Sequence, residues 1–359
     1  MEAQENLDPI TGPLAEAVEQ VIAQTGLPSV SIAIVRDGVV AWAGAYGFAN
    51  LAAQVPATTG SYYSAGSTFK LATATAVMQL VQKGSISLDT ALNEVLGPEL
   101  AIDGADNVTV RHLLAHRSGL DAFSTARRIN PVGPVSTVPL WSRRDFIAIE
   151  DVIRNTRPAT PPGESFSYCN DCYGILGYVV ERLSGQTFDE YVADHVLRPL
   201  GVEIETPSVP TPRVVERMAL PYDVSSGRPS PVHQVRYDLA AAGDVYLTAT
   251  DMARFLAAQM NDCRSGEVRL LSVDSCRELR RQQFEGRPYG LGISLARVRD
   301  RELITHSGSI PGFSSFMVGE PASKQGVYVM ANGFGADGAL SRIATRYTMQ
   351  LLWESGGGE

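Results

Sequence analysis

Residues 64–70 read Ser-Ala-Gly-Ser-Thr-Phe-Lys and lead directly into a helical pattern that begins at Leu71. On a helix, the side chains of Ser67 and Lys70 share one face, with Cβ atoms about 5 to 6 Å apart. A serine hydroxyl is a poor nucleophile until a neighbour takes its proton, and an amine can take it once its pKa is lowered. The start of a helix also presents backbone N–H groups to developing negative charge. The stretch therefore predicts Ser67 as a nucleophile and Lys70 as part of its activating base.

The same spacing has a simpler interpretation, in which Ser67 only caps the helix and Lys70 is a solvated residue at its end. The residues that follow favour the catalytic interpretation, because they make the helix strongly apolar and therefore central to the fold: Val77, Met78, Leu80 and Val81. A lysine on the first turn of such a helix would be partly desolvated.

Strand-forming segments lie at both ends of the chain. Near the start, a helix over 14–24 precedes β-rich runs at 29–35 and 39–46, joined by Asp37-Gly38, a dipeptide that favours a tight hairpin. Near the end we expect strands at 289–295, 302–305, 313–318 and 326–330, and then a helix over 339–353.

The middle of the chain is mostly helical in pattern. We expect helices at 68–82, 87–95, 110–115, 173–183, 188–196 and 250–259, with Thr248 and Asp251 forming a capping box. The economical fold class is α/β of the α+β type: an antiparallel sheet domain from residues 1–60 and 285–359, flanked by terminal helices, with a mainly helical domain inserted over 61–284. Segments rich in Pro and Gly, at 130–139, 157–163 and 207–231, are candidate walls of a substrate cleft.

Composition narrows the possible partners. The 359 residues carry a formal net charge of -9, with 44% hydrophobic and 19% charged residues, and no basic run that could neutralise a line of phosphates. We therefore expect a globular protein that does not act on nucleic acid. No apolar stretch approaches the length of a membrane span. The acidic first residues do not resemble a secretory signal, so we expect a periplasmic or secreted protein if a signal peptide was removed, and otherwise a cytoplasmic one.

Four cysteines allow three pairings, and the sequence does not choose among them. Cys263 and Cys276 are candidates for a disulfide or for two unpaired thiols. Cys169 and Cys172 have the C-x-x-C spacing of redox and metal sites, but no βαβ pattern precedes them and no second close pair follows. Buried thiols or a local disulfide are the favoured interpretation, and we expect no metal or other cofactor.

A second group of polar residues follows the turn-forming stretch 161–164. Tyr168 and Asn170 are two apart, so in an extended segment both would project the same way. The phenol could relay a proton, while the amide could bind a substrate carbonyl and Lys70. The alternative is a buried tyrosine and a helix-capping asparagine.

A third group lies at 305–309, where His306, Ser307 and Gly308 end an expected strand. A glycine there permits close approach by a substrate lying along the strand edge. The N–H of Ser309 could then join that of Ser67 to hold an oxyanion. The alternative is an ordinary strand end with a partly exposed histidine.

Two other hydrolase classes fit poorly. No G-x-S-x-G pentapeptide of the α/β-hydrolase type occurs. His112 and His116 have zinc-ligand spacing, but Leu113 stands where a zinc hydrolase carries glutamate, so packing or helix-end roles are favoured. His195 and His233 have no chemical companions in the sequence.

Ser-x-x-Lys, Tyr-x-Asn and His-x-Gly, in that order, resemble the motifs of the penicillin-recognising serine hydrolases: class C β-lactamases, D-Ala-D-Ala carboxypeptidases, D-aminopeptidases and related esterases. Further stretches echo this family at 113–120, 243–248 and 308–315. The resemblance implies a β-lactamase/transpeptidase-like fold and an acyl-enzyme on Ser67. It also implies that Lys70 and Tyr168 shuttle the proton, and that Asn170, His306, Ser307 and Gly308 bind the substrate.

Two departures from the family pattern bear on the substrate. His306 stands where class C β-lactamases carry lysine, and a neutral imidazole pairs less well with the carboxylate of a β-lactam. This favours a D-peptidase or an esterase, with a class C-type β-lactamase as the alternative and a non-catalytic sensor as a further one. Cys169 stands where a small residue is usual, and a bond to Cys172 would stiffen or tilt the second motif.

Overall fold

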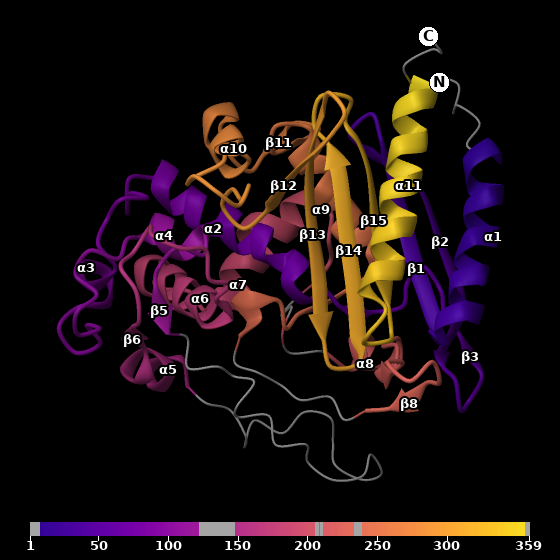
Figure 1. Ribbon diagram of the computed structural model, residues 1–359, viewed down its shortest axis with the longest axis horizontal. Helices are drawn as coiled ribbons and strands as arrows, with labels where there is room; N and C mark the ends of the chain where they lie inside the picture. The colour runs from indigo at the N-terminus through magenta and orange to yellow at the C-terminus, as the bar shows by residue number, and fades with distance from the viewer. Residues whose placement is uncertain (1–7, 122–147, 205–207, 209–210, 233–238, 356–359) are drawn as a thin grey trace.

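The computed structural model describes residues 8–121, 148–204, 208, 211–232 and 239–355 (Figure 1). The expected loop at 130–139 and His233 lie outside these residues, as does part of the segment 207–231.

The centre of the molecule is a seven-stranded antiparallel sheet built from both ends of the chain, as expected. Strand β1 pairs with β15, from Val30 opposite Ala331 to Val35 opposite Gly326. In order, the strands are β12 (Ser294–Val298), β13 (Arg301–Ile310), β14 (Phe313–Glu320), β15 (Gln325–Ala331), β1 (Ser29–Arg36), β2 (Val39–Asn50) and β3 (Val55–Pro56). The hairpin between β1 and β2 turns at Asp37 and Gly38, whose φ angles are 53° and 76°. The Asp-Gly signal is thereby confirmed, because a tight hairpin turn of this kind needs positive φ at both positions.

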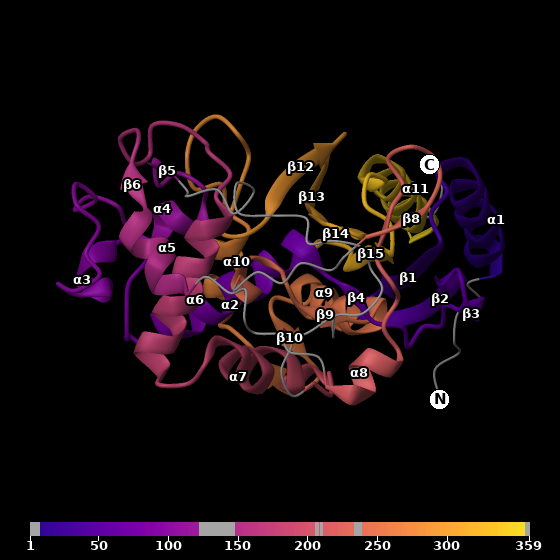
Figure 2. The same ribbon diagram turned by 90° about the horizontal axis from the view of Figure 1, so that it is seen from below.

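The two faces of the sheet are covered by different helices (Figures 1 and 2). Helices α1 (Asp8–Thr25) and α11 (Asp337–Ser355) pack side by side, with α11 against β14 and β15. Helix α9 (Ala249–Met260) packs against β1, β2 and β15 on the opposite face. Val30, Ile32 and Ile34 face the terminal helices, whereas Ala33 and Val35 belong to the core shared with the helical part. This alternation is the period of two that a sheet buried on both sides requires.

The helical part lies to the left of the sheet in Figure 1. Its remaining α-helices are α2 (Lys70–Gln82), α3 (Leu92–Leu96), α4 (Val110–Leu114), α5 (Ile149–Asn155), α6 (Asn170–Ser184), α7 (Phe188–Val192), α8 (Pro212–Glu216) and α10 (Val273–Leu279). The short helical turns are η1 (Gly66–Phe69), η4 (Ala193–Leu197), η5 (Arg198–Leu200) and η6 (Ala240–Ala242). The short strand pairs are β4 (Tyr63–Ser64) with β9 (Tyr246–Leu247), β5 (Leu120–Asp121) with β6 (Arg157–Pro158), β7 (Tyr222–Asp223) with β8 (Ser230–Pro231), and β10 (Arg264–Ser265) with β11 (Val268–Arg269). The capping box of Thr248 and Asp251 at the start of α9 is confirmed.

Two elements begin later in the chain than the sequence predicts. The helix expected at 87–95 begins only at Leu92, because the Ser87 and Thr90 side chains bond backbone N–H groups of a turn instead. The strand expected at 289–295 begins at Ser294. A bend precedes it, where Gly292, at a φ of 75°, packs so closely on the Lys70 carbonyl that a Cβ would lie 2.7 Å from that oxygen.

The division into a sheet domain and an inserted domain at residues 60 and 285 remains a proposal. Helix α9 lies within the expected insertion, yet it packs directly on the sheet. One continuous core joins the sheet residues Ala33 and Tyr328 to the helical residues Leu71 and Leu176. The two parts therefore meet over a shared interior.

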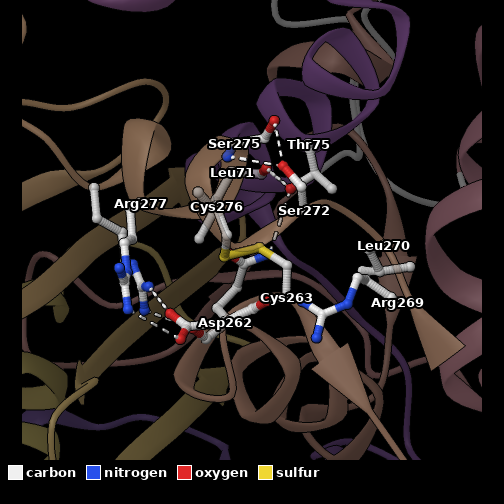
Figure 3. The surroundings of a disulfide bond; sticks show 12 residues. Leu71, Thr75, Asp262, Cys263, Arg269, Leu270, Ser272, Ser275, Cys276 and Arg277 are labelled. Carbon is white, nitrogen blue, oxygen red and sulfur yellow. Dashed lines mark hydrogen bonds and ion pairs between the residues drawn. A yellow bond between two sulfur atoms is a disulfide. The ribbon is translucent and has the colours of Figure 1, made fainter. Parts of the chain in front are cut away.

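Both pairs of cysteines form disulfides. Cys263–Cys276 links the segment after α9 to α10, and both of its cysteines are fully buried (Figure 3). Cys169–Cys172 spans three residues at the start of α6. The local disulfide, one of the alternatives left open for the C-x-x-C pair, is the one that forms.

Candidate active site

Ser67 lies in the turn η1, immediately before helix α2, on the side of the sheet that faces the helical part. It is the one residue between Ser61 and Leu80 that is not buried. The turn before it needs Gly66, whose φ is 56° and at which a Cβ would lie 3.0 Å from the Ser309 nitrogen. The fold thus surrounds the Ser67 backbone with packed atoms and leaves the side chain accessible.

Hydrogen bonds with strands β14 and β15 hold this turn in place. The Thr68 hydroxyl donates to the Ala65 carbonyl at 2.7 Å and lies 2.5 Å from the Tyr328 hydroxyl of β15. The Ser315 hydroxyl of β14 donates to the same Ala65 carbonyl at 2.5 Å. The position of Ser67 is therefore tied to the central strands of the sheet.

Lys70 is fully buried, which rules out the alternative of a solvated helix end. Its Nζ lies 2.9 Å from Ser67 Oγ, 2.8 Å from Asn170 Oδ1 and 2.7 Å from the Ala242 carbonyl oxygen. The pKa of Lys70 is well below its usual 10.5, because burial penalises the charged amine. The neutral amine is therefore more accessible at this position than in an exposed lysine.

The partners of Lys70 determine where the lone pair of a neutral amine points. Asn170 Oδ1 and the Ala242 carbonyl oxygen can only accept hydrogen bonds, so they take the two N–H groups. In the neutral form of the amine, those two bonds would leave the lone pair for the hydroxyl of Ser67, whose Oγ lies 2.9 Å away. This is the geometry that a general base needs to remove the proton of a nucleophile.

Tyr168 lies on the other side of Ser67, in a segment without regular secondary structure. Its hydroxyl is hydrogen-bonded to the Ser67 side chain, and its ring centroid lies 5.0 Å from Lys70 Nζ. The residue is 43% exposed, so it is not the buried tyrosine of the alternative interpretation. Burial of the hydroxyl raises the pKa of Tyr168, although the bond to Ser67 and the charge of Arg287 act in the opposite direction. The phenol therefore stays protonated near neutral pH and can donate a proton.

Asn170 is the first residue of α6 and not part of an extended segment. The residue that caps this helix is Cys169, whose sulfur accepts the N–H of Cys172. Asn170 is exposed, while its amide oxygen reaches inward to Lys70. The expected contact between the second motif and Lys70 is thus present, although the local backbone differs from the expectation.

Strand β13 provides the remaining side of the site. Its partner β12 begins at Ser294, which lies opposite Thr305, so residues 306–310 pair with β14 on one side only among the described residues. Gly308 lies against the nucleophile turn: a Cβ there would be 2.4 Å from the Ala65 carbonyl and 3.1 Å from the Ser67 nitrogen. Ser307 and Ser309 are exposed. The strand therefore presents an unpaired edge beside Ser67, as the sequence predicts.

His306 is buried with both ring nitrogens bonded inside the protein. Burial lowers the pKa of His306 to about 4. The imidazole is consequently neutral: Nδ1–H donates to the Ser307 carbonyl at 2.7 Å, and Nε2 accepts from the Tyr289 hydroxyl at 3.0 Å. Because both ring nitrogens are taken up by these bonds, direct binding of a substrate by His306 stays a prediction.

Sequence reasoning missed three residues around the site. Tyr173 donates to the Leu114 carbonyl at 2.8 Å and places its ring centroid 5.3 Å from Lys70 Nζ. Arg287 is exposed and lies 4.6 Å above the ring of Phe166. His116, assigned to packing or a helix end, lies directly against Tyr168. Its only sequence signal is its place in the 113–120 stretch.

The family model described as Beta-lactamase matches residues 14–348. The chain belongs to the beta-lactamase family. Penicillin-binding protein 4 of Amycolatopsis lactamdurans is a relative that is 29% identical to this chain. The alignment covers 92% of this chain and 86% of that protein. Protein flp of Staphylococcus aureus strain MW2 is 26% identical over 88% of this chain, which spans 61% of flp. The octameric penicillin-binding protein homologue from Pyrococcus abyssi has a similar structure, with a TM-score of 0.79, 27% identity, and coverage of 97% of this chain and 78% of that one.

The beta-lactamase-family protein is accordingly a serine hydrolase of the beta-lactamase-related type, with the expected β-lactamase/transpeptidase-like fold. Among the residues that the structure describes, no helix is both long and apolar enough to cross a membrane. The same residues contain no cluster of three or more His, Cys, Asp or Glu suited to a metal ion.

Proposed function

We propose that this protein cleaves an amide or ester bond of a small-molecule or peptide substrate through an acyl-Ser67 intermediate. The observation that carries the proposal is the fully buried Lys70 amine, 2.9 Å from Ser67 Oγ, with its other two polar contacts made to pure acceptors. A desolvated neutral amine in this position can accept the serine proton near neutral pH.

The reaction then needs two acyl transfers. Ser67 Oγ attacks the substrate carbonyl and gives its proton to Lys70, while the N–H groups of Ser67 and Ser309 hold the oxyanion. Tyr168 passes a proton to the leaving amine or alcohol as its bond to carbon breaks, and is reprotonated from Lys70. Water attacks the acyl carbonyl in the second step and loses its proton to the same pair, and Ser67 regains a proton as it leaves.

The residues near Ser67 favour a D-amino-acid peptide or amide, or a simple ester, over a β-lactam. His306 is neutral and occupied, so it provides no charge for a carboxylate at the strand edge. Ser307 and Ser309 are exposed and offer hydroxyls to a substrate lying along that edge. Arg287 places one exposed cation close enough to influence the pKa of Tyr168, and this cation would suit the carboxylate of a peptide and that of a β-lactam alike.

A substrate panel tests this proposal: p-nitrophenyl acetate, D-amino-acid amides, a peptide ending in D-Ala-D-Ala, and nitrocefin. We expect repeated turnover of an ester or of a D-amino-acid amide or peptide, and slower turnover of nitrocefin. Fastest turnover of nitrocefin would favour a β-lactamase, and a single acylation without turnover on every substrate would favour a sensor. Arg287→Gln should raise KM for the peptide and for nitrocefin, which both carry a carboxylate, and not for p-nitrophenyl acetate or the amides. Exposed Arg297→Gln on β12 is the matched control.

A further inference from the structure

Tyr168 is held at both of its backbone neighbours by one residue. The N–H of Ser167 donates to the His116 carbonyl at 2.9 Å, and the N–H of Cys169 donates to His116 Nδ1 at 3.0 Å. His116 itself is fully buried. The segment that carries the phenol, which has no helix or strand of its own to fix it, is therefore anchored on both sides of Tyr168.

The same histidine also supports the side chain of Tyr168. The two ring centroids are 4.2 Å apart, with the planes tilted by 34°. The imidazole contacts further aromatic rings, which hold it in turn: Tyr173 and Tyr289 at 5.1 Å and Phe166 at 5.6 Å. One face of Tyr168 is thus backed by a packed aromatic cluster, while the residue as a whole remains 43% exposed.

Two costly features show that position 116 is constrained by more than packing. The φ of His116 is 57°, in the left-handed region that non-glycine residues seldom adopt. Because Nδ1 accepts a hydrogen bond, the neutral ring carries its proton on Nε2, and this buried atom has no hydrogen-bond partner among the described residues. Leaving a buried donor unpaired destabilises the fold. Strain of this kind persists where the surroundings enforce it, and it gathers at functional sites.

We propose that His116 is a positioning residue, which holds the Tyr168 hydroxyl on Ser67 through the ring contact and the two backbone bonds. The inference rests on the proposed role of Tyr168 in proton transfer. His116 acts through Tyr168 and does not touch the reacting atoms.

A double-mutant cycle of His116→Ala and Tyr168→Phe separates positioning from general stability. We expect His116→Ala to lower kcat about 10- to 100-fold with little change in KM, which is within the range of a single acid–base contribution. In the Tyr168→Phe background the same change should cost less than about 3-fold, because residues that act as a unit are not additive. Equal losses in the two backgrounds would overturn the inference.

Two further variants keep the test valid. His116→Asn tolerates a left-handed backbone and keeps an acceptor for the Cys169 N–H, so it should recover part of the lost kcat; it replaces His116→Ala in the cycle if the latter does not fold. His112→Ala is the matched control, because His112 lies four residues earlier and stacks on Phe284 at 5.3 Å. It should leave kcat unchanged, and rates are normalised to the fraction of Ser67 labelled by a fluorophosphonate. A wild-type chain that turns over no substrate would refute the proposed function, whereas a cycling wild type with additive losses would refute only the role of His116.

Discussion

Ser67 and Lys70 lie on a turn and helix that are almost entirely buried, whereas Tyr168 lies in an irregular segment and is 43% exposed. The first side of the site is tied to the central strands through Thr68 and Ser315. The second is tied to the fold by His116 and by a disulfide that begins one residue after Tyr168.

The difference follows from the chemistry that each side performs. A lysine can act as a base near neutral pH only when it is desolvated, and a buried helix supplies that environment. A phenol that delivers a proton to a leaving group must instead reach the substrate from the open side, so its position has to be enforced from behind. We therefore expect mutations of Ser67 and Lys70 to abolish the reaction, and mutations of the residues behind Tyr168 to weaken it.

The largest effect is expected at the buried base. Lys70→Ala should slow acylation of Ser67 by about 10²-fold or more, because it removes the amine that lies 2.9 Å from Ser67 Oγ. The measurement is the rate of the p-nitrophenol burst with p-nitrophenyl acetate. Lys83→Ala, at the exposed end of the same helix, is the control, and equal burst rates in the two variants would contradict the assigned role.

Tyr168→Phe should have a smaller effect, of about 10- to 100-fold on kcat, because the ring and its contact with His116 remain while the proton donor is lost. An activated ester, whose leaving group needs no proton, should lose less than an amide. Single-turnover rates on p-nitrophenyl acetate and on a D-amino-acid amide give the comparison. Equal losses on both substrates would argue against proton delivery by Tyr168.

The two disulfides provide a matched pair for the same contrast. Replacing Cys169 and Cys172 by alanine should lower kcat several-fold with little loss of stability, because the loop it closes is very short. Replacing Cys263 and Cys276, which close a longer loop, should lower the free energy of unfolding by about 3 kcal/mol and leave kcat unchanged. The free energy of unfolding, from chemical denaturation, and kcat are measured for both double variants. A loss of kcat in the Cys263 and Cys276 variant, with none in the Cys169 and Cys172 variant, would contradict the structural role given to Cys169.

The smallest effect on activity is expected at His306. Its main effect should be on the free energy of unfolding at acidic pH. Its folded pKa of about 4 is below the ordinary 6.5, so its stabilising effect is complete above pH 6.5 and is lost as the pH falls toward 4. His306→Gln should therefore make the free energy of unfolding less dependent on pH across this window. An unchanged pH dependence would show that the imidazole is not held neutral.

Local patterns predicted the parts of the molecule that depend on neighbours in sequence. The Asp37-Gly38 turn and the spacing of Ser67 and Lys70 are such cases, because backbone geometry alone relates the residues. The role of His116 could not be predicted in this way, since its partners Ser167 and Cys169 lie about fifty residues further along the chain.

Other features depend on packing that no local pattern encodes. The Ser-x-x-Lys motif predicts the pair but not the full burial of Lys70 or its third contact, with the Ala242 carbonyl. The resemblance placed His306 at the site, yet its bond to Tyr289 joins residues seventeen positions apart, which no local pattern relates.

The central claim is that a neutral, buried Lys70 activates Ser67. The most direct test is the rate of fluorophosphonate labelling from about pH 5 to about pH 10, with the adduct located by peptide mass spectrometry. We predict an adduct on Ser67 and a labelling rate that rises with pH as Lys70 loses its proton. The midpoint of this rise should lie at a pH well below 10.5, and the rise should be lost in Lys70→Ala. Labelling at another residue, or a pH profile that Lys70→Ala leaves unchanged, would contradict it.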